Sequence, residues 1–189
     1  METGCFEETG RTADPAAGRV HIYCGDGKGK TSAAVGLAVR AAGRGRKVLI
    51  ARFLKSDDSG EVRSLAEIPG ICVMPCLKTF GFFWSLSEEQ KREAGEYCRG
   101  LFCGAWDRAV VEKADMLVLD EIMAAMKHGL IREEEVRDCL SGRPAGLEVV
   151  LTGRDPSPEM VKLADYVSEI RKVKHPFDDG IRAREGIEY

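Results

Sequence analysis

The sequence has no excess of positive charge and no long apolar run. Its 28 Lys and Arg against 31 Asp and Glu give a formal net charge of −3, so we expect no nucleic-acid partner. No stretch approaches the roughly 18 apolar residues that cross a bilayer, and the first residues are acidic and polar, unlike a secretory signal. We therefore expect a cytoplasmic protein with no membrane partner.

The sequence also has no closely paired cysteine motif. It contains seven cysteines and three histidines, and the closest cysteine spacings are Cys72/Cys76 and Cys98/Cys103. An odd cysteine count without zinc-ligand spacing favours reduced thiols that pack as small hydrophobic groups over a metal site.

What is present is an alternation of short apolar runs and helical patterns after residue 19. Residues 1–19 show no apolar periodicity and are predicted to be a mobile arm, followed by a single domain over 20–189 that includes an extended C-terminal tail. Strands are predicted at 20–24, 47–54, 71–76, 116–119, 147–151 and 166–170. Helices are predicted at about 30–42, 61–68, 87–113, 132–140 and 158–164.

Strands that alternate with helices in this way indicate right-handed crossovers. The strands are rich in Val, Ile and Leu, as burial on both faces requires. The predicted fold is α/β and P-loop NTPase-like, with a mostly parallel central sheet of five to six strands and helices on both faces. The pattern leaves the strand order open.

A glycine-rich loop, "GDGKGKT" at 25–31, lies between the first strand and the first helix. Glycines permit positive φ, so backbone N–H groups can converge on phosphate oxygens at a helix N-terminus. The P-loop motif would place glycine at Cys24, and the alternative is a surface turn before an amphipathic helix, but the strand–loop–helix context favours phosphate binding. The predicted nucleotide-binding residues in this segment are Gly25, Asp26, Gly27, Lys28, Gly29, Lys30, Thr31 and Ser32.

Two further strand ends carry polar side chains. Asp120 and Glu121 follow the strand "MLVL" and are candidate ligands of a Mg²⁺ shared with Thr31; the alternative for one of them is a cap on the following turn. Arg154, after the next strand, is predicted to touch phosphate, and the alternative is a solvated loop residue. These features alone indicate ATP hydrolysis or phosphoryl transfer, with Glu121 as a possible base for water.

Several stretches together resemble the P-loop family of ATP:corrinoid adenosyltransferases over about residues 20–189. In order along the chain, they are "CGDGKGKTSAAVGLAVRAAGRG", "RFLK", "GFFW", "VLDE", "LTGR" and "VKHPFDDGIRAREGIEY". The resemblance implies that a Co(I) corrinoid attacks the 5′-carbon of ATP and that triphosphate leaves. The loop would then hold a leaving group, stabilised by Lys28, Lys30 and Mg²⁺ (or Mn²⁺), and Glu121 would be a metal-associated carboxylate instead of a base.

The resemblance also assigns residues outside the loop. Arg40 matches a family arginine that contacts phosphate, and Phe82 and Trp84 match aromatics that face the corrin. Apolar rings that displace a lower axial base would ease reduction of Co(II); the alternative for the aromatic stretch, favoured for Phe80 or Phe83, is a hydrophobic plug. The residues expected to take part in catalysis are Lys28, Lys30, Phe82 and Trp84.

The resemblance further implies an electron donor, such as a reduced flavoprotein, and a homodimer. Two other functions remain open from the residues. An ordinary P-loop ATPase or small-molecule kinase would break a bond at phosphorus, and a non-catalytic corrinoid or nucleotide carrier would break none.

Overall fold

Strands and helices alternate along the residues that the computed structural model describes, which are 17–81 and 83–188. The strands are β1 (Val20–Cys24), β2 (Val48–Arg52), β3 (Ile71–Val73), β4 (Met116–Asp120), β5 (Glu148–Thr152) and β6 (Tyr166–Glu169). The helices are α1 (Lys30–Ala42), α2 (Gly60–Ala66), α3 (Glu88–Val111), α4 (Ile122–Lys127), α5 (Glu133–Ser141) and α6 (Pro158–Leu163), with 3₁₀ turns η1 (Phe83–Ser85) and η2 (Pro176–Asp179).

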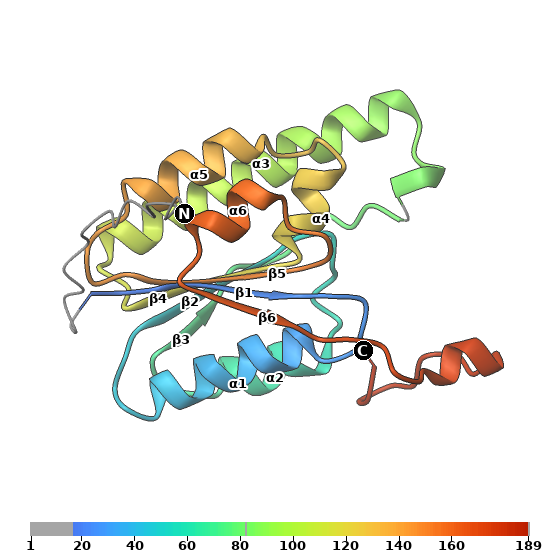
Figure 1. Cartoon of the computed structure of the whole chain (residues 1–189), viewed down its shortest axis with the longest axis horizontal. Coiled ribbons are helices and arrows are strands. Elements are labelled where there is room, and N and C mark those ends of the chain that lie inside the picture. The colour runs from blue at the N-terminus through green and yellow to red at the C-terminus, as the bar shows by residue number, and fades with distance from the viewer. Residues whose placement is uncertain (1–16, 82, 189) are drawn as a thin grey trace, which may run out of the picture.

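The strands form one six-stranded sheet in the order β3-β2-β4-β5-β1-β6, and neighbouring strands pair in parallel. Helices α1 and α2 cover one face, and α3, α4, α5 and α6 cover the other (Figure 1). The predicted α/β fold is confirmed. Because all strands run the same way, their carboxyl ends meet at one edge, where the loops after β1, β2, β4 and β5 lie together.

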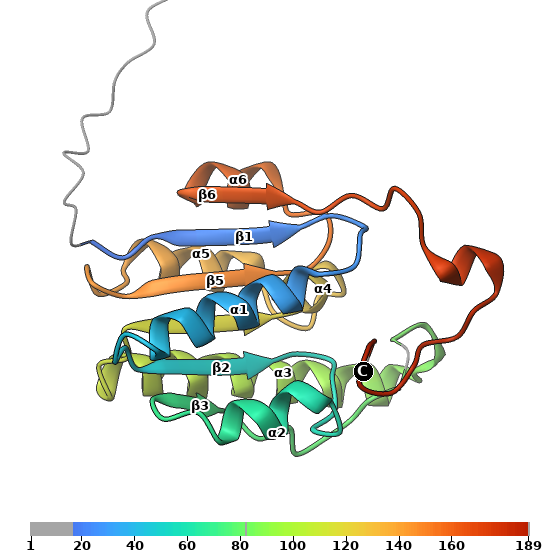
Figure 2. The same cartoon turned by 90° about the horizontal axis from the view of Figure 1, so that it is seen from below.

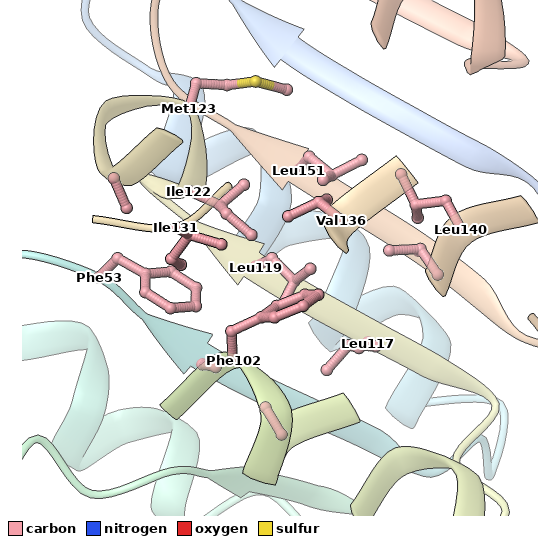
Figure 3. Close-up of a cluster of buried hydrophobic side chains, with 14 of the residues drawn as sticks. Phe53, Phe102, Leu117, Leu119, Ile122, Met123, Ile131, Val136, Leu140 and Leu151 are labelled. Carbon is pink, nitrogen blue, oxygen red and sulfur yellow. The ribbon is translucent and has the colours of Figure 1, made fainter. Parts of the chain in front are cut away.

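Each central strand is apolar on both sides. Leu117 and Leu119 of β4 belong to the core under α3 and α5, whereas Val118 belongs to the core under α1. Successive strand side chains point to opposite faces, so a strand covered on both faces needs apolar residues throughout. Figure 3 shows the larger core, with Phe102 of α3 packed beside Leu119.

Local sequence signals account for several helix ends. Ser87 and Gln90 form the predicted capping box at the start of α3, each side chain accepting from the backbone N–H of the other. Ser157 caps α6, with Pro158 in the first turn. The prediction missed α4, a six-residue apolar helix directly after β4 whose sequence has no polar face and no capping side chain. Strand β3 is shorter than predicted and ends before Pro75.

The chain ends depart from the predictions in part. Most of the predicted arm, residues 1–16, lies outside the described residues. Gly18 and Arg19 already belong to the packed domain, because the Gly18 N–H donates to the Ala145 carbonyl (2.7 Å) and the Arg19 N–H donates to the Glu148 carboxylate (2.9 Å). The C-terminal tail extends beyond the carboxyl ends of the strands in both views and includes η2 (Figures 1 and 2).

Among the described residues, no helix combines the length and apolar content needed to cross a bilayer.

Phe102 tests the packing of the larger core. Its side chain is 1% exposed, so Phe102→Ala should lower the free energy of unfolding by about 3–5 kcal/mol through lost burial and a residual cavity. Val111→Ala on the same helix, at a residue 79% exposed, should change it by no more than about 0.5 kcal/mol. Urea denaturation measures both, and equal effects would contradict the assigned core.

Candidate active site

The glycine loop follows β1 at the carboxyl edge of the sheet. Gly25 and Gly29 have φ values of 103° and 124°, which favour glycine. A Cβ on Gly25 would also lie 2.3 Å from the Ile170 carbonyl oxygen, and one on Gly27 would lie 2.7 Å from the Arg171 carbonyl carbon. The loop therefore needs glycine for its conformation and for the close passage of the chain after β6.

Cys24 shows why the missing first glycine of the motif does not disrupt the loop. It is the last residue of β1, 6% exposed, and its side chain joins the larger core. Burial raises the pKa of its thiol, and Glu169 raises it further. The residue packs as a small hydrophobic group, as predicted for the cysteines.

Lys30 starts α1 and lies inside the loop. The residue is 8% exposed, and its Nζ donates to the Gly27 carbonyl oxygen at 2.9 Å. Burial lowers the pKa of the ammonium, while the nearby Glu121 carboxylate opposes that shift. The Lys30 ammonium is therefore partly desolvated, and it contacts the backbone of the glycine loop.

Asp120 ends the central strand β4 and is 2% exposed. Its Oδ1 accepts from the hydroxyls of Thr31 (3.0 Å) and Thr152 (2.7 Å), and its Oδ2 accepts from Lys55 Nζ (2.5 Å). The structure therefore brings the predicted pair Thr31 and Asp120 together. The sequence assigned no role to Thr152 or Lys55, although both stand at strand ends in the quoted stretches "LTGR" and "RFLK".

Glu121 and Arg154 lie close to this pair. Glu121 adopts a left-handed conformation (φ 62°), and its N–H donates to Thr152 Oγ1 at 2.8 Å. Its carboxylate and the Arg154 guanidinium both act on the pKa of Lys30, so both side chains lie near the loop. Arg154 follows Gly153, where a Cβ would lie 2.5 Å from Met123 Cβ.

The C-terminal tail returns to the loop. Lys28 Nζ pairs with Glu188 Oε1 at 3.0 Å, and Asp26 Oδ1 accepts from the Lys172 N–H at 2.9 Å. This backbone hydrogen bond is the main cause that lowers the pKa of Asp26. Residues far apart in sequence therefore meet on the loop, an arrangement that no local pattern in the sequence indicates.

The aromatic segment lies between β3 and α3. The Phe83 ring stacks on His128 with centroids 4.2 Å apart, and Phe80 packs 5.8 Å from Tyr97, which supports the plug interpretation for these two residues. Trp84 is 76% exposed. Phe82, the other predicted corrin-facing ring, lies outside the described residues. The segment extends beyond the same end of the sheet as the tail (Figures 1 and 2).

Two further residues predicted to bind nucleotide, Arg40 and Ser32, lie at opposite ends of α1. Arg40 lies ten residues along α1 from Lys30, about 15 Å along the helix axis, and is exposed in the last turn, where its charge acts on Tyr23. The structure therefore does not bring Arg40 to the loop of the same chain. Ser32 is in the first turn of α1 and is exposed.

The oxygens of Thr31 and Asp120 suit a hard divalent cation. Among the described residues, no three His, Cys, Asp or Glu side chains converge as a metal site. Mg²⁺ commonly uses one or two carboxylates together with substrate phosphates. The donor set therefore fits a metal that is held jointly by the protein and a phosphate group.

Comparison with known proteins identifies the family. The profile described as "ATP:corrinoid adenosyltransferase BtuR/CobO/CobP" matches residues 16–189. This chain belongs to that family. The Escherichia coli (strain K12) "Corrinoid adenosyltransferase" is 36% identical over 94% of this chain and 88% of its own length, and the Salmonella typhimurium "Corrinoid adenosyltransferase CobA" shows the same identity and coverage.

Among solved structures, the chain is similar to "EssC (ATPases 2 and 3) from Geobacillus thermodenitrificans" at 13% identity and TM-score 0.49. That similarity covers 89% of this chain and 35% of the other.

The Lys28–Glu188 contact in this adenosyltransferase predicts a pH dependence. Hydrogen bonds from Arg184, then from Lys28, lower the pKa of Glu188 from 4.5 to about 2. The stabilisation that Glu188 contributes, mainly through Arg184 within the tail and in part through Lys28 of the loop, is therefore complete above pH 4.5 and lost as the pH falls through about 2. Carboxylate titration by NMR should show this low midpoint, and Arg184→Ala should raise it.

Arg182→Ala serves as the matched control, because Arg182 is also exposed in the tail and should leave the midpoint unchanged. A wild-type midpoint near the ordinary 4.5 would contradict the contacts of Glu188 with Arg184 and Lys28.

Proposed function

We propose that this protein transfers the 5′-deoxyadenosyl group of ATP to a Co(I) corrinoid, releasing inorganic triphosphate, in adenosylcobalamin synthesis or salvage. The observation that carries the proposal is the cluster at the carboxyl edge of the sheet, in a chain of this family. There Lys30 lies in the glycine loop and Thr31 bonds Asp120 at 3.0 Å.

In this reaction the cobalt–carbon bond forms as the bond between the ribose 5′-carbon and the triphosphate oxygen breaks. The electron pair of that bond leaves on the triphosphate. Lys28, Lys30 and the backbone N–H groups of the loop would bind this growing negative charge, which is the charge stabilisation that positioned donors supply best. Arg154 would add a further cation from the loop after β5. No phosphorus is attacked, so Glu121 needs no role as a base.

Thr31 and Asp120, with Glu121 nearby, would hold Mg²⁺ (or Mn²⁺) at the triphosphate. When bound, the ion would neutralise charge on the leaving group. Asp120 keeps Thr31 oriented, because the Thr31 hydroxyl donates to its carboxylate.

Trp84 and Phe82 would face the corrinoid. The exposed indole of Trp84 in η1 offers a flat apolar surface, which would exclude a lower axial base and so favour the four-coordinate cobalt. The reaction needs an electron donor, such as a reduced flavoprotein, and we expect the enzyme to act in the cytoplasm as a homodimer.

The products distinguish this function from its alternatives. With ATP, Mg²⁺ and chemically reduced cobalamin, we expect a light-sensitive cobalt–carbon product by absorbance and triphosphate by phosphorus NMR. Lys30→Ala should lower kcat/KM by about 10²–10³-fold because one charge-stabilising contact is lost. Lys162→Ala, an exposed lysine on α6, should have no effect.

ADP and phosphate without an alkylcobalt product would instead indicate an ATPase or kinase. Tight corrinoid binding without turnover would indicate a carrier.

Trp84 tests the corrinoid surface. Trp84→Ala should slow adenosylation of cobalamin by about tenfold or more, as for loss of an aromatic binding anchor, and should affect a corrinoid without a lower base less. Steady-state rates with both corrinoids measure the difference. Tyr166→Ala, at the amino end of edge strand β6, is the aromatic control, and equal losses for both corrinoids would contradict the assigned role of Trp84.

A further inference from the structure

Lys55 is the cation in the site that neither the P-loop nor the proposed reaction uses. Its Nζ donates to Thr31 Oγ1 at 2.8 Å and to Asp120 Oδ2 at 2.5 Å. Its side chain is 25% exposed and that of Asp120 is 3% exposed. The ammonium therefore lies directly on the two side chains that supply the oxygen donors of the proposed metal site.

The loop that carries Lys55 is fixed on its amino-terminal side. Phe53 is fully buried, and its N–H donates to the Asp120 carbonyl oxygen at 2.9 Å, which ties the end of β2 to the end of β4. Leu54 then adopts a left-handed conformation with φ 55°. The chain thus turns sharply just before Lys55.

The carboxyl-terminal side is fixed by Arg52, which is 2% exposed. Its Nη1 donates to the Ser56 carbonyl oxygen at 2.8 Å, and its Nη2 pairs with Asp57. Asp57 in turn accepts from the Cys76 N–H at 2.9 Å. A buried guanidinium therefore braces the segment after Lys55 against the chain after β3, and Lys55 is not a freely moving surface lysine.

An ammonium and a divalent cation compete at such oxygens. Thr31 and Asp120 would supply oxygen ligands to Mg²⁺, but Thr31 Oγ1 and Asp120 Oδ2 already accept from the Lys55 ammonium. Lys30 and Arg154 add positive charge nearby, because both the Arg154 and Lys55 charges lower the pKa of Lys30, and Glu121 and Asp26 oppose them. A triphosphate would add acceptors for the Lys55 ammonium, and its negative charge would allow the ammonium and the divalent metal to bind together.

We propose that Lys55 competes with the divalent metal for Thr31 and Asp120, so that the metal binds tightly only together with the triphosphate. This inference rests on the proposed function for the location of the metal. Lys55 is then a positioning residue. Its ammonium neutralises the buried Asp120 carboxylate before substrate binds, and it releases Asp120 when the nucleotide arrives. Metal and nucleotide binding are then coupled through one side chain.

Manganese binding to the protein without nucleotide tests the proposal. Free Mn²⁺ is followed by electron paramagnetic resonance during titration of the wild type, Lys55→Met and Lys162→Met. Because a competing charge is removed, Lys55→Met should bind Mn²⁺ about tenfold or more tightly than the wild type. Lys162→Met should match the wild type, and the double variant Lys55→Met, Asp120→Asn should lose the gain.

Addition of ATP completes the test. ATP should raise the affinity for Mn²⁺ strongly in the wild type. The ratio of the affinities with and without ATP should be much smaller in Lys55→Met. Equal Mn²⁺ affinities for the wild type and Lys55→Met, or weaker binding by Lys55→Met, would overturn the proposal. Lys55→Gln, which keeps a neutral donor at this position, is measured in parallel, and thermal melting verifies that each variant is folded.

The readout needs no corrinoid and no turnover, so the two proposals fail separately. A gain in Mn²⁺ affinity without any cobalt–carbon product would support the role of Lys55 and reject the adenosyltransferase activity. Normal product formation by the wild type, together with equal Mn²⁺ affinities for the wild type and Lys55→Met, would support the adenosyltransferase activity and reject the role of Lys55.

Discussion

The site depends on one buried carboxylate. Asp120 is at the end of the central strand, 2% exposed, and a buried charge is tolerated only when it is paired and hydrogen-bonded. Its partners come from three other parts of the fold: Thr31 from α1, Thr152 from β5 and Lys55 from the loop after β2. The hydrogen bonds of this one group therefore join α1, the neighbouring strand β5 and the Lys55 loop. The same requirement makes the oxygens of Asp120 and Thr31 available together, which a hard cation needs.

A second constraint comes from the chain after β6. It passes so close to the glycine loop that Cβ atoms at Gly25 or Gly27 would clash with Ile170 and Arg171, and the Gly27 N–H donates to the Ile170 carbonyl at 2.8 Å. The tail then returns Glu188 to Lys28. The loop is therefore shaped from two sides, by its own glycines and by the tail. A ligand that takes Lys28 as a phosphate contact must compete with Glu188 for it.

Charged groups of both signs surround the loop, and this bears on the chemistry. The cations Lys28, Lys30, Lys55 and Arg154 lie on or near it, and so do the carboxylates of Asp26, Asp120, Glu121 and Glu188. Such an arrangement is suited to hold a polyanion whose charge increases during the reaction. Trp84, in the segment between β3 and α3, is exposed. In the proposed reaction its indole would supply a contrasting apolar surface for the flat macrocyclic nucleophile.

The sequence by itself determined the α/β class, the six strands and the capping box of α3. It also determined the pairing of the glycine loop with the acid at the end of "MLVLD". Strand periodicity, helix caps and strand-end motifs are local signals, so each can be recognised along the chain. Only the tertiary structure decided the strand order, the partners of Asp120 and the contact between the tail and the loop. It also left Arg40 in the last turn of α1, away from the glycine loop, whereas the family resemblance had assigned it a contact with phosphate. Hydrogen bonds such as Lys55 to Asp120 or Lys28 to Glu188 join residues 65 and 160 positions apart. Which distant side chain completes a buried pair is fixed by the packing of the sheet and its helices, and no periodicity along the chain encodes it.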